Sequence, residues 1–202
     1  IDTEGSQIRT GNTYEIFLKE GEEIKIYNRK VACDKNKIFL TPIDIIKRFS
    51  IGDLISVDFN STLLKVSNVS NFETEGFITC KVLISGIVGG RKAIYIDDFL
   101  DLPTFSNKDF QAIEIAKKYG VKIFTLSFIR NREEVLTFRK IYPEAILYSK
   151  IEVREAIRNL KEILEVSDGI LIDRGDLSKE VPIEKIPLIQ KYILNEARKQ
   201  GK

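Results

Sequence analysis

The chain has 202 residues, 43% of them hydrophobic, which is enough to bury a sizeable core. Lys and Arg total 32 against 30 Asp and Glu, and the net charge of +2 excludes a bulk field that would recruit nucleic acid or an anionic membrane. Histidine is absent, which excludes a histidine base, a Ser-His-Asp triad and a zinc site with histidine ligands.

The N-terminus and the cysteines also limit the class of protein. No apolar run approaches the roughly 18 residues that cross a membrane, and no signal pattern is present, so we expect a cytoplasmic protein without a membrane partner. Cys33 and Cys80 lie far apart outside any C-x-x-C pattern, and we expect both to be reduced. Because methionine is absent and the chain opens on Ile1, we expect that an N-terminal portion precedes it.

Residues 1–9 have the pattern of a strand that leaves a parallel barrel, and Gly5 would allow another backbone to approach closely. From Gly11 the pattern changes to short β-branched or aromatic runs separated by turn signals, at residues 14–18, 23–27, 37–41, 54–58, 62–66, 77–84 and 92–96. These runs follow one another too closely for crossover helices. Residues 12–91 therefore predict a small all-β domain, with hinges at Gly11 and within residues 86–91.

Strand and helix patterns alternate in the remainder of the chain. Ser106 is a helix N-cap and Gly120 a helix stop, and they bound a predicted helix over residues 107–119. Further helices are predicted over residues 133–142, 153–164 and 186–198, and strands over residues 121–127, 145–149 and 169–173. Such an alternation makes the strands parallel.

The predicted fold class is α/β, a partial (β/α)8 barrel of the TIM type with an inserted small all-β lid domain. Residues 1–11 supply one barrel strand, residues 12–91 the lid, and residues 92–202 the βα units. These strands make about half of an eight-stranded barrel. Because half a barrel exposes two sheet edges, we expect that this part does not fold alone.

Charged residues follow the last two predicted strands where each strand ends, with Lys150 and Glu152 after one and Arg174 and Asp176 after the other. The C-terminal ends of parallel strands carry the chemistry in barrels of this kind. Neighbouring strands lie about 4.8 Å apart, so Glu152 and Asp176 can approach one ion, and two carboxylates with open positions suit Mg²⁺ or Mn²⁺. Lys150 would then face a bound anion. Solvated ion pairs at strand ends are the alternative, and spacing alone does not decide between the two.

Several segments resemble one known family in the same order along the chain. LSFIRNREEV, SKIE, EILEVSDGILIDRGDL and VPIEKIPLIQK resemble segments of the pyruvate kinase family, and IDTEGSQIRTG resembles that family's LDTKGPEIRTG. The resemblance covers essentially the whole chain. It implies phosphoryl transfer from phosphoenolpyruvate to ADP, giving pyruvate and ATP in glycolysis.

The resemblance also assigns roles to individual residues. It places the catalytic lysine on Lys150 and the Mg²⁺ or Mn²⁺ carboxylates on Glu152 and Asp176, and the substrate carboxylate falls on the backbone N–H groups of Gly175 and Asp176. A lysine there cancels charge that develops on the bridging oxygen, and preorganised amides bind an anion without reorganisation.

The resemblance assigns nucleotide and potassium roles to the first hundred residues. The K⁺ site maps in part to Asp2 and Thr3, and nucleotide phosphate maps to Arg9 and to Lys92, which the lid would bring in. The chain departs from the family's pattern mostly on this side, at Glu4, Ser6, Gln7, Phe59 and Tyr95. We therefore expect weak or altered use of nucleotide and potassium.

Asp173 is a further departure, because it replaces the family's alanine before the RGD motif and adds a carboxylate beside the metal pair. Like charges that close raise a carboxylate's pKa unless a cation neutralises them. The family's other substrate residues fall outside this chain, so the site is expected to be incomplete. Two alternatives to the kinase remain: a pseudoenzyme or regulatory module that keeps a Mg²⁺ and pyruvate or phosphoenolpyruvate pocket, and an enolate lyase. A homo-oligomer is compatible with each of these.

Overall fold

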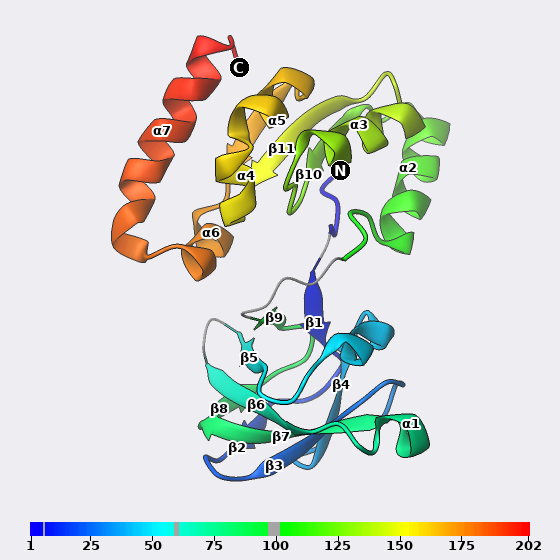
Figure 1. The fold of residues 1–202 in the computed structure, drawn as a ribbon. Coiled ribbons are helices and arrows are strands. Elements are labelled where there is room, and N and C mark those ends of the chain that lie inside the picture. The colour runs from blue at the N-terminus through cyan, green and yellow to red at the C-terminus, as the bar shows by residue number, and fades with distance from the viewer. Residues whose placement is uncertain (6, 59–60, 97–101) are drawn as a thin grey trace. The chain divides into compact units, whose positions relative to one another are not determined.

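The structure, a computed structural model, describes residues 1–5, 7–58, 61–96 and 102–202. The chain divides into two compact units (Figure 1). One consists of Ile1–Ser6 and Leu102–Lys202 and is called the αβ unit here, and the other consists of Gln7–Asp101 and is called the β unit. The sequence prediction drew the inserted domain at 12–91, inside the β unit.

The β unit is built from short strands of β-branched and aromatic residues: β1 Ile8–Thr10, β2 Ile16–Leu18, β3 Glu23–Tyr27, β4 Lys37–Thr41, β5 Leu54–Val57, β6 Thr62–Asn68, β7 Phe77–Ile84, β8 Gly86–Val88 and β9 Ala93–Ile96. Within the described residues, seven strands close into a barrel in the order β1-β4-β3-β7-β6-β5-β9. The side chains alternate between the inside and the outside of this barrel: Ile24 and Ile26 of β3 are buried, while Glu23 and Lys25 are exposed. Short helices, η1 Ile43–Arg48 and α1 Phe72–Glu75, lie in the connections.

Within the segment expected to contain a hinge, 86–91, the first three residues form a strand. Gly86–Val88 forms β8, which pairs with β2 in a separate two-stranded sheet with Phe17 opposite Ile87. A Cβ on Gly86 would lie 1.7 Å from the carbonyl oxygen of Ser61. The glycine therefore marks a close approach of two backbones, which the sequence pattern does not distinguish from a hinge.

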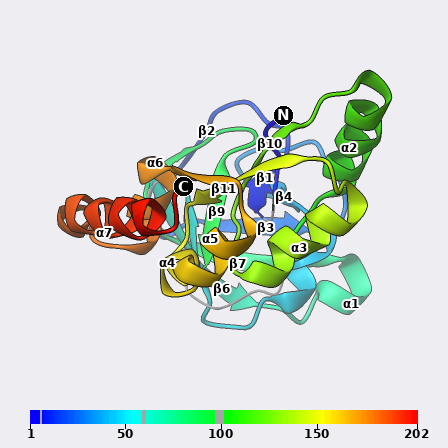
Figure 2. The same cartoon turned by 90° about the horizontal axis from the view of Figure 1, so that it is seen from above.

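The αβ unit alternates helices and strands: α2 Asn107–Tyr119, β10 Ile123–Leu126, α3 Arg132–Ile141, β11 Ile146–Ile151, α4 Arg154–Arg158, α5 Leu160–Val166, β12 Gly169–Ile172, α6 Arg174–Glu180, η2 Ile183–Lys185 and α7 Ile186–Lys199. The strands form a parallel sheet in the order β10-β11-β12. Viewed from above, α3 lies beside α4 and α5 (Figure 2). Among the described residues, none of the helices has the length and apolar character needed to cross a membrane.

The predicted helix over residues 153–164 is divided into α4 and α5 at Asn159. The Asn159 side chain donates a hydrogen bond to the carbonyl oxygen of Arg130, 2.9 Å away. Asparagine side chains form such polar contacts at the expense of regular helical conformation. Asn159 accordingly departs from it, with φ −97° and ψ 15°, between α4 and α5. Helix α6 was not predicted either, and it places the RGD motif in its first turn.

The predicted strand over residues 1–9 is also divided. The N–H of Thr3 donates to the Thr125 carbonyl oxygen at 2.9 Å and the N–H of Thr125 to that of Ile1 at 2.8 Å, which adds the N-terminus to the β10 edge in parallel. Residues 8–10 instead form β1 of the β unit. Between them Gly5 has a left-handed backbone, with φ 67°, which turns the chain out of the sheet.

Replacing Gly5 with alanine is expected to destabilise the αβ unit by roughly 2–4 kcal/mol, from the left-handed backbone and from overpacking. The added Cβ would lie 2.6 Å from the backbone oxygen of Ser127. Gly120→Ala is the matched control, because Gly120 has a φ of 68° but nothing within 4 Å of its Cβ position. Urea unfolding followed by circular dichroism measures the free energy of unfolding of both variants. An equal decrease in both would mean that the contact with Ser127 does not add to the destabilisation.

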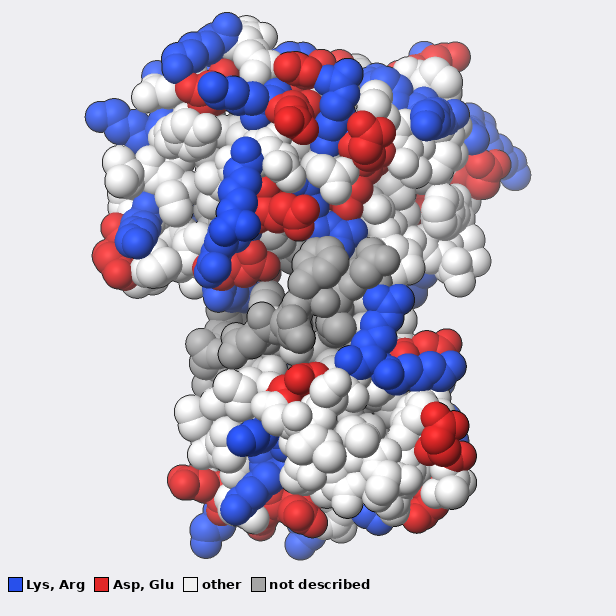
Figure 3. All heavy atoms as spheres, viewed as in Figure 1, with Lys and Arg blue, Asp and Glu red and all other residues white. Residues whose placement is uncertain are grey.

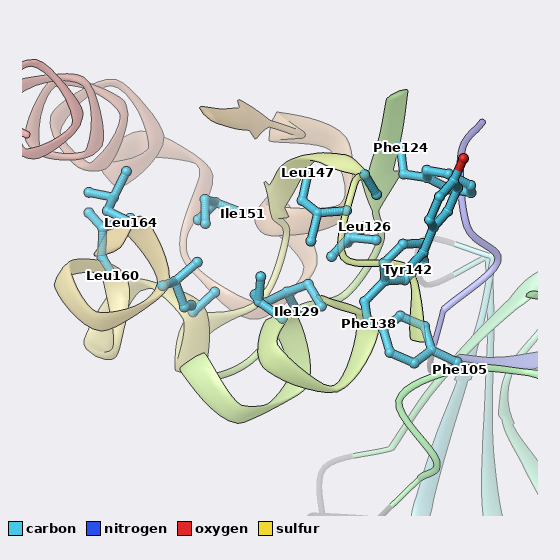
Figure 4. Close-up of a cluster of buried hydrophobic side chains, with 14 of the residues drawn as sticks. Phe105, Phe124, Leu126, Ile129, Phe138, Tyr142, Leu147, Ile151, Leu160 and Leu164 are labelled. Atoms are coloured by element: carbon cyan, nitrogen blue, oxygen red, sulfur yellow. The ribbon is translucent and has the colours of Figure 1, made fainter. Parts of the chain in front are cut away.

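One face of the sheet buries the main apolar cluster of the αβ unit (Figure 4). The aromatic rings of Phe105, Phe124, Phe138 and Tyr142 gather at one end of it, and Phe138 lies 4.8 Å from Phe124 between ring centroids. In β11 every second side chain is buried in this direction, and the intervening ones, Lys150 among them, point to the other face.

Candidate active site

Four charged side chains meet where β11 and β12 end: Lys150, Glu152, Asp173 and Asp176. The Lys150 ammonium lies 2.7 Å from Glu152 Oε1 and 3.8 Å from Asp173 Oδ2. One oxygen each from Glu152, Asp173 and Asp176 lie within 4.8 Å of one another. The parallel strands bring these groups together because both strands end at the same edge of the sheet.

Glu152 is the most deeply buried member of this cluster. Its Oε2 accepts a hydrogen bond from the N–H of Phe128 at 2.6 Å. Its Oε1 is buried and has the Lys150 ammonium as an ion-pair partner, but within the described residues it takes no hydrogen bond of normal geometry. Burial raises the pKa of Glu152, and the Lys150 ammonium and the Phe128 N–H offset that effect only in part.

Lys150 is surrounded by acceptors from four segments of the chain. Besides Glu152 and Asp173, it lies 3.7 Å from Asp2 Oδ2 and 3.4 Å from the hydroxyl of Ser127. Burial lowers the pKa of Lys150, but the carboxylates of Glu152, Asp2 and Asp173 outweigh burial, so the pKa stands above its ordinary value. The lysine is therefore a fixed positive charge at neutral pH.

Asp173 and Asp176 flank the start of α6. Asp173 is its N-cap, and Oδ1 accepts hydrogen bonds from the N–H groups of Gly175 at 3.1 Å and Asp176 at 3.2 Å. Asp176 Oδ1 is paired with the Lys179 ammonium. The sequence prediction assigns the N–H groups of Gly175 and Asp176 to a substrate carboxylate. In the structure they donate to the Asp173 carboxylate instead.

The donor set fits a divalent ion. Mg²⁺ and Mn²⁺ take carboxylate oxygens, and oxygens on opposite sides of Mg²⁺ lie about 4.2 Å apart, twice its bond length. The three oxygens lie within 4.8 Å of one another, so they would have to move only slightly closer to take adjacent and opposite positions around one ion. The buried Oε1 of Glu152 supports the fit, since it has the Lys150 ammonium beside it but no hydrogen bond of normal geometry among the described residues, and a metal ion would stabilise it further.

The sequence-predicted potassium residues lie against β10. Asp2 Oδ1 accepts hydrogen bonds from the hydroxyls of Thr125 at 2.6 Å and Ser127 at 3.3 Å. The Thr3 hydroxyl oxygen accepts from the N–H of Ser127 at 2.9 Å. The structure brings Asp2 next to Lys150, so this segment and the strand-end cluster share one polar network.

Sequence reasoning missed three contributors to this network: the Ser127 hydroxyl, the Phe128 N–H and the Lys179 ammonium. Phe128 has φ 55°, which is unusual for a residue with a bulky side chain, and this backbone accompanies its N–H bond to Glu152. Ser127 follows directly after β10, so its position past a parallel strand end was a usable signal. The spacing of Lys179 three residues after Asp176 on a helix was another.

The predicted nucleotide residues lie in the β unit. Arg9 in β1 donates a hydrogen bond to the Arg91 carbonyl oxygen at 2.7 Å, and the Lys92 ammonium lies 2.8 Å from Asp58 Oδ2. Each is therefore held by its own unit. Ser6 and Phe59, two of the departures from the family pattern, lie outside the described residues.

Charged residues elsewhere do not form a single-sign field on the face shown in Figure 3, where Lys and Arg alternate with Asp and Glu over the described residues. This accords with the small net charge of the chain. The cluster of Lys150, Glu152, Asp173 and Asp176 differs from these surface charges because it is partly buried and its charged groups lie within a few ångströms of one another.

Comparison with known proteins identifies the family. The family model described as "Pyruvate kinase, barrel domain" matches residues 1–202. Pyruvate kinases of Staphylococcus epidermidis and Staphylococcus aureus (strain MRSA252) are each 32% identical to this chain over 209 aligned residues. The alignment covers 100% of this chain but 35% of either relative, so the chain spans about a third of their length. The chain belongs to the pyruvate kinase family.

Proposed function

We propose that the protein transfers a phosphoryl group from phosphoenolpyruvate to ADP, producing pyruvate and ATP as a glycolytic enzyme of the cytosol. The observation that carries the proposal is the buried Lys150–Glu152 ion pair, 2.7 Å long, with two more carboxylates beside it at the ends of parallel strands. Burying charges costs free energy that a purely structural surface pair would avoid. Membership of the pyruvate kinase family supports this reaction among those that such a cluster can serve.

Lys150 is the proposed catalytic residue. Its ammonium is charged, directed by three carboxylates, and placed to neutralise the bridging oxygen of the transferred phosphoryl group. Glu152 and Asp176 would hold the divalent ion. When bound, that ion supplies charge neutralisation for the phosphoryl oxygens.

The remaining assignments complete the proposal. The N–H groups of Gly175 and Asp176 would receive the substrate carboxylate. Arg9 and Lys92 would contact nucleotide phosphate, and Asp2 and Thr3 would contribute to a K⁺ site. Their support is the match of each residue to the family's motifs.

We also propose the finer architecture for the whole protein. The parallel βα units of the αβ unit would form part of a (β/α)8 barrel, and the predicted all-β domain over residues 12–91 would act as its lid. The parallel order β10-β11-β12 supports the first statement, and the closed barrel of β-strands supports the second.

A second candidate is a binding module that has lost turnover. The observation that favours it is the hydrogen bonding of Asp173 Oδ1 to the N–H groups of Gly175 and Asp176. A substrate carboxylate would have to displace this internal carboxylate. Such a module would hold pyruvate or phosphoenolpyruvate with Mg²⁺ but transfer no phosphoryl group.

The intact protein, assayed for pyruvate release from phosphoenolpyruvate and ADP with Mg²⁺, is expected to turn over but to bind ADP weakly and to depend little on K⁺. Each lost charged hydrogen bond on the nucleotide side costs about 1.5–3 kcal/mol, or roughly tenfold or more in affinity. Glu184→Gln, in the exposed η2 turn, is the control and should behave as the parent.

Two results would redirect this proposal. Binding of phosphoenolpyruvate with Mg²⁺ but no ADP-dependent pyruvate would establish the binding module instead. Turnover with ordinary ADP affinity and strict K⁺ activation would show that the nucleotide-side substitutions are neutral.

A further inference from the structure

Asp173 uses its two carboxylate oxygens differently. Oδ1 is fixed by the two amides at the start of α6, at 3.1 and 3.2 Å. Oδ2 faces the Lys150 ammonium, 3.8 Å away. An anchored carboxylate with its second oxygen directed into a charged cluster is preorganised to bind a cation there, because little side-chain freedom is left to lose.

The charges around Asp173 are unbalanced. Lys150 and Lys179 are paired with carboxylates that belong to Asp2, Glu152, Asp173 and Asp176. Four carboxylates against two ammonium groups leave a formal charge of −2 in this set. One divalent cation cancels that charge, and without Asp173 the remaining charge would be −1.

A second observation points to a ligand rather than to a solvated acidic surface. Glu152 is buried, and its Oε1 takes no hydrogen bond of normal geometry within the described part of the chain, although the Lys150 ammonium lies beside it. Glu152 belongs to the same group of three carboxylates as Asp173 and Asp176. The Lys150 ammonium offsets part of the cost of burying this carboxylate, and a metal ion beside it would offset more.

We propose that Asp173 is a third carboxylate ligand of the divalent ion, beside Glu152 and Asp176, and that it strengthens binding of the ion in the absence of substrate. The inference rests on the metal site of the proposed function. It goes further, because water completes the ligands of an ion held by two carboxylates, whereas a third fixed carboxylate replaces one of those waters and raises the affinity of the free protein for the ion.

The test is Mn²⁺ binding to the intact protein without substrate, followed by the loss of the free-ion electron paramagnetic resonance signal. Asp173→Asn keeps an oxygen for the α6 amides but removes the charge, and it is expected to weaken Mn²⁺ binding by roughly tenfold or more, the scale seen when a metal site loses a supporting group. Asp173→Ala is expected to weaken it further, and circular dichroism verifies that both variants are folded. Glu184→Gln, which removes an exposed charge of the same sign in the αβ unit, is the matched control and should bind as the parent.

The outcomes separate this inference from the proposed function. Weaker binding in Asp173→Asn, with Glu184→Gln unchanged, supports the third ligand. If Glu152→Gln and Asp176→Asn abolish binding while Asp173→Asn binds as the parent, the metal site stands and the role of Asp173 is overturned. If the parent protein binds no Mn²⁺ without substrate, the substrate-independent site is overturned, and a repeat titration with phosphoenolpyruvate present then decides on the two-carboxylate site by itself.

Discussion

Replacing Lys150 with methionine is expected to lower kcat/KM for pyruvate formation by roughly 10²–10³-fold or more, the usual cost of removing one preorganised charge from a transition state. Methionine keeps the length of the side chain but removes the ammonium that three carboxylates orient. Arginine should not restore activity, because its planar guanidinium does not fit a site built for a point charge. Lys185→Met, in the exposed η2 turn, is the control and should keep full activity.

The same substitution has a second, independent readout. Without Lys150, the buried Glu152 loses a partner that lowers its pKa, so this pKa should rise further above its ordinary value. A carboxyl group whose pKa is higher in the folded than in the unfolded state binds its proton more tightly when folded. Relative to the parent, the Glu152 contribution to the free energy of unfolding of Lys150→Met should therefore be largest in acid and fall as the pH rises from the ordinary glutamate pKa through the raised one. Urea unfolding across that pH range measures this, and a pH profile parallel to the parent's would contradict the ion pair.

Phe138→Ala is expected to destabilise the αβ unit by about 3–5 kcal/mol, the range for deleting a buried aromatic ring. Phe138 is fully buried, and its ring lies 4.8 Å from that of Phe124 and 5.5 Å from that of Phe105. Tyr119→Ala is the control: Tyr119 is 71% exposed at the end of α2, and its loss should cost under about 0.5 kcal/mol, as usual for surface positions. Thermal unfolding of both variants measures the difference. A similar loss in both would mean that the aromatic cluster does not act as the core.

Sequence periodicity predicts most elements of the αβ unit because local signals decide them. The helix over 107–119 agrees with α2 at both ends, since a capping box at Ser106 and a left-handed Gly120 terminate it chemically. The division at Asn159 was not predictable in the same way, because it depends on a hydrogen bond to Arg130, far away in sequence. The division of residues 1–9 likewise depends on which partners the backbone meets on either side of Gly5.

The candidate site shows the same limit. Lys150, Glu152 and Asp176 are recognisable from the sequence because strand ends and motifs mark them, and the structure places their charged groups at one edge of the sheet. The Phe128 N–H is invisible to such reasoning, since a backbone donor carries no residue type. Asp173 was recognisable as an extra carboxylate. Only the structure shows that its Oδ1 accepts a hydrogen bond from the start of α6 while its Oδ2 faces the Lys150 ammonium.

Asp109 has a consequence for the order in which the chain folds. Its carboxylate completes the capping box of α2 by accepting from the N–H of Ser106 at 2.8 Å, and it also accepts from the N–H groups of Glu4 at 2.6 Å and Gly5 at 3.2 Å. These bonds to Glu4 and Gly5 close a loop that contains the whole β unit. Closing so long a loop has an entropic cost that local contacts must offset first. The first turn of α2 can form by itself, whereas the N-terminal segment has to wait for it. Asp2 is synthesised before Lys150, and we expect their contact to form late, so that assembly of the candidate site is expected among the last steps in the folding of the αβ unit.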